Sequence, residues 1–175
     1  LQVYVVYIPE YKTAAMELFT NKDKLFDVIN TNHNLLPVFN RFGIRPGFKD
    51  KTVEDVCIEK NINQDFFLAL INTYNNPAYF PENELLSFPP ELIVDYLRKT
   101  HIYYIEYFLP KIEGHLNNLI NEDKAGNKDL KMIVTFYEKY KKEFLLHIQD
   151  EEENVFPYVL RLINEGEEHE NDSPD

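Results

Sequence analysis

The sequence predicts an all-α protein: a small helical module followed by a long antiparallel helical hairpin. Apolar residues recur at steps of three and four over most of the chain, and helix-capping residues and breakers separate the segments. The one β-type run, Val3 to Ile8, is closed by Pro9 and has no partner strand. With 175 residues, 44% of them hydrophobic, the chain can bury a substantial core.

Breakers and charge divide the chain into four segments. We expect an N-terminal appendage over residues 1–20, the small helical module over 21–84, the hairpin over 85–163 and an acidic, solvated tail over 164–175. The boundary near residue 85 follows from the breaker-rich stretch between Asn75 and Pro90, which reads as a linker.

Capping residues indicate where the helices of the small module begin and end. Gly43 is well placed to end a helix, Asn63 to begin one, and Thr52 with Asp55 resembles a capping box. Cys57 is the only cysteine, so the chain has neither an internal disulfide nor a Cys-based zinc site. We interpret it as a small buried hydrophobe in a reducing compartment, most simply the cytoplasm.

The hairpin is predicted from two helical patterns, over residues 91–120 and 130–163, joined by a turn at 121–127. Pro110 and Pro157 interrupt these helices and should kink them locally. The expected apolar stripes are Val94, Leu97, His101, Tyr104, Ile105, Phe108, Ile112, His115 and Leu119 on the first helix, and Ile133, Tyr137, Tyr140, Phe144, His147, Glu151 and Val155 on the second.

Two polar residues lie on the second stripe. His147 and Glu151 are four residues apart, so they face the same way on a helix. A carboxylate that points into a helix bundle must be paired, protonated or bound to a metal. Imidazole and carboxylate ligands together suit iron, manganese or zinc.

His101 on the first helix can join this pair. It lies as far before the turn as His147 lies after it, about 30 Å at about 1.5 Å per residue, so the two are level in an antiparallel hairpin. His115 lies about 21 Å along the helix from His101 and is excluded from the same site. The alternative is that His147 and Glu151 are ordinary surface residues of an acidic stretch.

A family resemblance covers roughly residues 20–162. The segment from His147 to Pro157 resembles the second-helix signature of hemerythrin-like domains, H-x-x-x-E followed shortly by Phe-Pro. His101 with Leu109-Pro110 behind it is similar to the first-helix histidine of that domain. The module that ends in Phe42-Gly43-Ile44 resembles the N-terminal domain of repair-of-iron-centres proteins.

The resemblance implies half of a hemerythrin-like four-helix bundle, with His101, His147 and Glu151 as ligands of non-haem iron. Two features depart from the family pattern: Arg45-Pro46-Gly47-Phe48 replaces a Cys-Cys pair, and the second ligand set is absent. A di-iron site therefore needs a second copy of the chain or sequence outside these residues. Because two hairpins can close one bundle and supply six ligands, we expect a homodimer.

The function implied is restoration of damaged iron-sulfur proteins, or a response to oxygen, nitric oxide or redox stress. The alternative is a metal-free helical interaction module, or the sensory half of a transcriptional regulator whose DNA-binding domain is absent from this chain. A net charge of −12 disfavours direct contact with nucleic acid or anionic lipid, and no apolar run is long enough to span a membrane. No catalytic motif is present, so whether the protein is an enzyme stays open.

Overall fold

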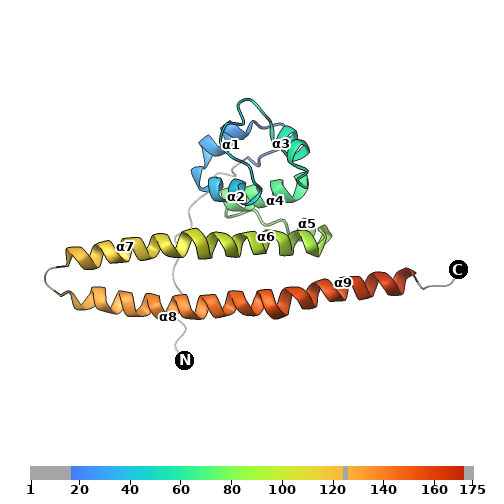
Figure 1. Cartoon of the computed structure of the whole chain (residues 1–175). Helices are drawn as coiled ribbons and strands as arrows, with labels where there is room; N and C mark the ends of the chain where they lie inside the picture. The colour runs from blue at the N-terminus through green and yellow to red at the C-terminus, as the bar shows by residue number, and fades with distance from the viewer. Residues whose placement is uncertain (1–16, 124–125, 172–175) are drawn as a thin grey trace. The chain divides into compact units, whose positions relative to one another are not determined.

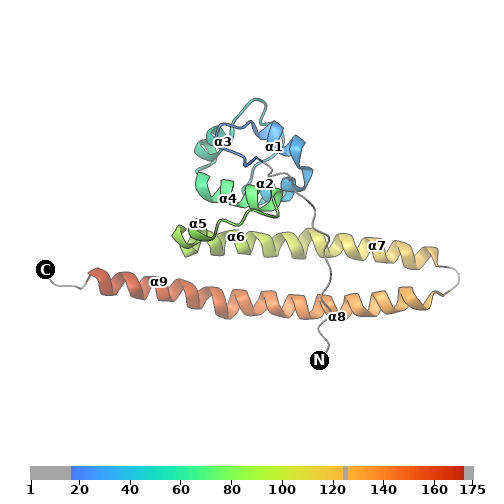
Figure 2. The ribbon, with the colours of Figure 1, turned by 180° about the vertical axis from the view of Figure 1, so that it is seen from behind.

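The computed structural model describes residues 17–123 and 126–171, and it confirms the all-α fold (Figures 1 and 2). Over these residues the only β-type pairing is an isolated bridge between Lys24 and Thr52. The chain divides into two compact units between Leu86 and Ser87, close to the boundary expected near residue 85. The β-type run expected at Val3 to Ile8 lies outside the described residues.

Short helices make up the first unit. Their bounds are α1 (Leu25–Thr31), the 3₁₀ turn η1 (His33–Leu35), α2 (Leu36–Arg41), α3 (Val53–Lys60), α4 (Gln64–Asn75) and α5 (Glu82–Ser87). Helix α5 lies inside the stretch expected to be an irregular linker. Pro81 precedes it, and Glu82 and Glu84 stand in its first turn, where acidic side chains are favourable to the helix dipole.

The capping residues of this unit act as the sequence predicted. Thr52 and Asp55 form a complete capping box: Asp55 N–H donates to the Thr52 hydroxyl over 3.1 Å, and Thr52 N–H donates to the Asp55 carboxylate over 2.9 Å. The bond from Thr52 N–H, together with the Thr52 hydroxyl, holds the pKa of the Asp55 carboxyl below its usual value. The Asn63 side chain accepts from Phe66 N–H and caps α4. Gly43, at φ +66°, ends α2.

Phenylalanine rings lie at the centre of the first unit. The Phe67 ring lies 5.3 Å from Phe39 and 5.1 Å from Phe42, between centroids. The buried core consists of Leu25, Val28, Leu35, Val38, Phe39, Ile44, Val53, Val56, Cys57, Phe67 and Ile71. Buried Asn72 accepts from Phe19 N–H and donates to Phe19 C=O, so residues 17–20 belong to this unit rather than to the expected appendage.

Cys57 is buried in this core, as the sequence predicted, and burial raises the pKa of its thiol to about 11. Because the thiolate is the reactive form, we expect iodoacetamide at pH 8 to alkylate the folded protein at least about 100-fold more slowly than the urea-unfolded chain. Mass spectrometry over time measures both rates, and equal rates would contradict the burial.

Two long helical rods form the second unit. The first rod consists of α6 (Pro90–Tyr103), the π turn η2 (Tyr104–Phe108) and α7 (Leu109–Glu122); the second consists of α8 (Lys128–Asp150), the π turn η3 (Glu151–Val155) and α9 (Phe156–Asn171). The rods run antiparallel in both views (Figures 1 and 2). No helix in the described ranges has both the length and the apolar character required to cross a membrane.

The second rod is longer than expected. Helix α9 continues past Ile163 to Asn171, into the segment predicted to be a solvated tail. Glutamates dominate this segment, and glutamate is a good helix former, so an acidic sequence can extend a helix that has already begun. Residues 172–175 of the expected tail lie outside the described part of the chain.

Each rod widens into a π turn directly before its proline. Pro110 and Pro157 have no N–H, and their rings would clash with the carbonyl four residues earlier in a regular α-helix. The residue before each proline donates its N–H to the carbonyl five residues earlier instead of four. Leu109 N–H donates to Tyr104 C=O, and Phe156 N–H donates to Glu151 C=O. The helices therefore accommodate the prolines through one extra residue per turn.

The π turns move the buried stripe by one position. Leu109 and Phe156 are buried, whereas Phe108 and Val155, which the spacing placed on the stripes, are largely exposed. Ile148 is also buried next to an exposed His147, but both precede η3 in α8, so the π turn does not account for this shift. Contacts across the rods include the Tyr137 hydroxyl donating to Leu109 C=O and an ion pair between Lys141 and Glu113.

Part of the apolar surface of α8 is exposed, although Phe136 stacks on Tyr140 and Tyr140 on Phe144 along the helix. We call this surface the open face, and it consists of Met132, Ile133, Phe136 and Tyr140, all of them exposed. His147 lies on the same side of the helix, because 11 residues at about 100° each bring it close to the angular position of Phe136.

Candidate metal centre

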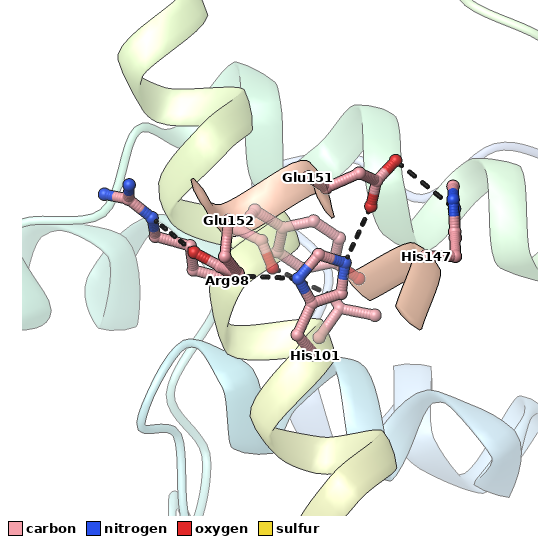
Figure 3. Close-up of polar contacts among 7 residues, drawn as sticks. Arg98, His101, His147, Glu151 and Glu152 are labelled. Atoms are coloured by element: carbon pink, nitrogen blue, oxygen red, sulfur yellow. Dashed lines mark hydrogen bonds and ion pairs between the residues drawn. The ribbon is translucent and has the colours of Figure 1, made fainter. Parts of the chain in front are cut away.

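His101 lies at the contact between the two rods, where α6 faces η3. It is 7% exposed, and each of its ring nitrogens contacts a carboxylate. Nε2 lies 3.1 Å from Glu151 Oε2, and Nδ1 lies 2.8 Å from Glu152 Oε1 (Figure 3). The equal distances from the turn predicted His101 level with His147, and the rods bring it to Glu151 and Glu152, about one helical turn further along.

Glu151 connects the two histidines. Its Oε2 faces His101, and its Oε1 lies 3.4 Å from His147 Nε2, so the carboxylate stands between two imidazoles (Figure 3). The side chain of His147 is 63% exposed, beside the open face, whereas that of Glu151 is 28% exposed. Within residues 17–123 and 126–171, no group of three or more His, Cys, Asp or Glu side chains is arranged as it stands to hold a metal ion.

Three residues that sequence reasoning did not assign complete the cluster. The Phe156 ring stacks on His101, with centroids 5.6 Å apart and planes 11° apart. Arg98 lies over the same ring, 5.8 Å from its centroid, and its Nε donates to Glu152 Oε2 over 3.0 Å. Arg98 precedes His101 by one helical turn, so the sequence placed it on the same face.

The π turn explains how two consecutive glutamates reach one imidazole. In an α-helix consecutive side chains point about 100° apart, which would carry Glu152 away from the ring that Glu151 contacts. More residues per turn reduce this angle, and η3 begins at Glu151. Pro157, which forces the wider turn, therefore helps to place both carboxylates around His101.

Each ring nitrogen of His101 faces a carboxylate oxygen. A neutral imidazole has one N–H, so it can donate to only one of the two carboxylates. The remaining ring nitrogen would then face a carboxylate oxygen, lone pair against lone pair. A proton or a metal ion at that nitrogen removes the repulsion, and both solutions are chemically possible for this cluster.

The distances suit a metal ion at Nε2. Imidazole and carboxylate ligands lie about 2.0–2.2 Å from a transition metal. Two ligand atoms are then about 3.0 Å apart when the ligand–metal–ligand angle is about 90°, and about 3.4 Å apart when it is tetrahedral. The separations of 3.1 Å and 3.4 Å from the two Glu151 oxygens to the histidine Nε2 atoms fall in this range, and they are equally the separations of metal-free ion pairs, while the imidazole nitrogens and carboxylate oxygens are donor types that transition metals accept. The donor set of this cluster therefore fits a metal.

His115, excluded by the length argument, lies on α7 with an exposed side chain.

Compared with known proteins, the chain matches no family model, no curated protein and no solved structure. Its function therefore has to be inferred from the cluster itself and from the motif that the cluster contains.

Proposed function

We propose that this chain is a hemerythrin-like protein that binds non-haem iron through His101, His147 and Glu151. The observation that supports the proposal is His101, a buried imidazole with a carboxylate oxygen close to each ring nitrogen. Nitrogen and carboxylate oxygen ligands suit iron. In this proposal the protein is cytoplasmic and acts in the repair of iron-sulfur centres or in a response to oxygen, nitric oxide or redox stress.

Each residue of the cluster has a different role in holding iron. The buried His101 supplies a fixed ligand, because Phe156 limits the rotation of its ring. Glu151 offers one oxygen on each side, and the exposed His147 can turn to meet the ion without rearranging the helices. When bound, the iron would supply the redox chemistry or the binding of a small diatomic molecule.

We further propose that a second copy of the chain completes the site. Three ligands do not fill the coordination sphere of two irons, and His147 lies next to the exposed open face. Two hairpins joined by their open faces would bury this apolar surface, form a four-helix bundle and place six ligands in its interior. Damaged iron-sulfur proteins are the partners that the repair role would require.

A metal-free interaction module is the alternative, and the open face also favours it. In that case the cluster holds no metal, and the open face binds another protein. This reading includes the sensory half of a transcriptional regulator. It differs from the iron proposal in one measurable respect, because the folded assembly would contain no metal.

Elemental analysis of the purified assembly tests the proposal. We expect one or two iron atoms per dimer after anaerobic loading with ferrous iron and gel filtration, and loss of that iron in His147→Ala, which leaves the buried contacts intact. His115→Ala, an exposed histidine on the same hairpin, is the matched control and should keep its iron. A folded, metal-free dimer of the unmodified protein would support the alternative instead.

A further inference from the structure

We infer that Glu152 is a positioning residue for the metal ligand His101, and that Arg98 holds Glu152 in place. This inference rests on the iron-binding function proposed above. It assigns a role to the Glu152 carboxylate, which lies outside the H-x-x-x-E motif. In the sequence Glu152 was recognised only as part of an acidic stretch.

The two ring nitrogens of His101 differ in their contacts, and we infer that they have different roles. Glu152 Oε1 lies 2.8 Å from Nδ1, the shortest contact of the ring, whereas Nε2 faces Glu151 at 3.1 Å. A histidine that binds metal through one nitrogen commonly donates its other N–H to a carboxylate, which fixes the tautomer and strengthens the ligand. In the tautomer with its N–H at Nδ1, His101 would donate to Glu152 and leave the Nε2 lone pair for the metal.

Arg98 keeps this carboxylate oriented. Its Nε donates to Glu152 Oε2 over 3.0 Å, so each oxygen of Glu152 has one partner and the carboxylate cannot rotate freely. Arg98 also lies over Phe156, the ring on which His101 stacks. One aromatic side chain therefore supports both groups that flank Glu152.

The neighbouring Glu153 provides a matched control. It lies one residue further along the same π turn, carries the same charge, and is exposed. Its Oε1 accepts from Gln149 Nε2 over 2.9 Å on its own helix. Glu152→Gln and Glu153→Gln therefore remove the same charge from the same turn, but only the first changes the partner of His101.

Titration of the metal-free full-length chain with Co²⁺, followed by its visible absorption, tests the inference. We expect Glu152→Gln to weaken Co²⁺ binding by about 10- to 100-fold and to shift the absorption band at saturation, since the imidazole loses its charged acceptor. Glu153→Gln should change the affinity by less than about threefold, because it alters only a screened surface charge. Arg98→Gln should lie between the two.

The outcomes separate this inference from the proposed function. If His101→Ala abolishes Co²⁺ binding but Glu152→Gln behaves like Glu153→Gln, Glu152 has no positioning role and the iron site stands. If the unmodified chain binds no Co²⁺, both ideas are overturned. A lower melting temperature of metal-free Glu152→Gln, with unchanged affinity and absorption, would make Glu152 merely a structural residue.

Discussion

Replacing His101 by alanine is expected to abolish iron binding and to loosen the hairpin. The substitution removes the only ligand from the first rod and leaves Glu151 and Glu152, two adjacent carboxylates, without the group between them. We expect affinity for ferrous iron to fall by more than about 100-fold, beyond the loss typical of an outer-shell change. Metal analysis after loading and gel filtration measures the result.

Stability provides a second measurement on the same variant. The metal-free His101→Ala protein should lose about 1–3 kcal/mol in free energy of unfolding, because a buried, hydrogen-bonded side chain stacked on Phe156 is removed. His115→Ala, the exposed control, should change neither quantity. A His101→Ala protein that retains iron as well as the unmodified chain would contradict the assignment of this histidine as a ligand.

Replacing Phe136 by glutamate is expected to separate the dimer and, with it, to empty the metal site. Phe136 is 70% exposed at the centre of the open face. A carboxylate there would be buried without a partner between two hairpins, which we estimate to cost roughly 3 kcal/mol, or about 100-fold in the dimer dissociation constant. Analytical ultracentrifugation should show the mass of one chain.

Phe26→Glu is the matched control for this experiment. Phe26 is 61% exposed on α1 in the first unit, so the same substitution is made on a surface with no proposed role. This variant should remain dimeric and keep its iron. If Phe136→Glu stays dimeric with its iron, the open face is not where the second copy binds.

Local signals in the sequence were sufficient for most of the first unit. The capping box of Thr52 and Asp55 and the Asn63 cap depend on bonds between residues three apart, so their pattern is visible in a short window. Helix α5 was missed because breakers on both sides suggested a linker. The extension of α9 was not predicted, because the acidic residues of this segment indicated a solvated coil. Glutamate also has a high helix propensity, which favours the longer helix.

The site was predictable in part. Equal distances from the turn predicted His101 level with His147, because an antiparallel hairpin converts sequence distance into height. In the structure His101 lies against Glu151 and Glu152, about one helical turn further along the second rod. Glu152 could not be assigned, since regular helical geometry turns it about 100° away from Glu151. The π turn before Pro157 reduces the angle between the two glutamates, and the sequence suggested a kink there rather than a wider turn.

Anomalous diffraction at the iron absorption edge tests the central claim most directly. Crystals of the iron-loaded protein should show an anomalous peak about 2.0–2.2 Å from His101 Nε2 and within reach of a Glu151 oxygen, with ligands from a second copy on its far side. Iron-loaded crystals with no peak there, and with His101 still held between Glu151 and Glu152 by protons alone, would contradict it.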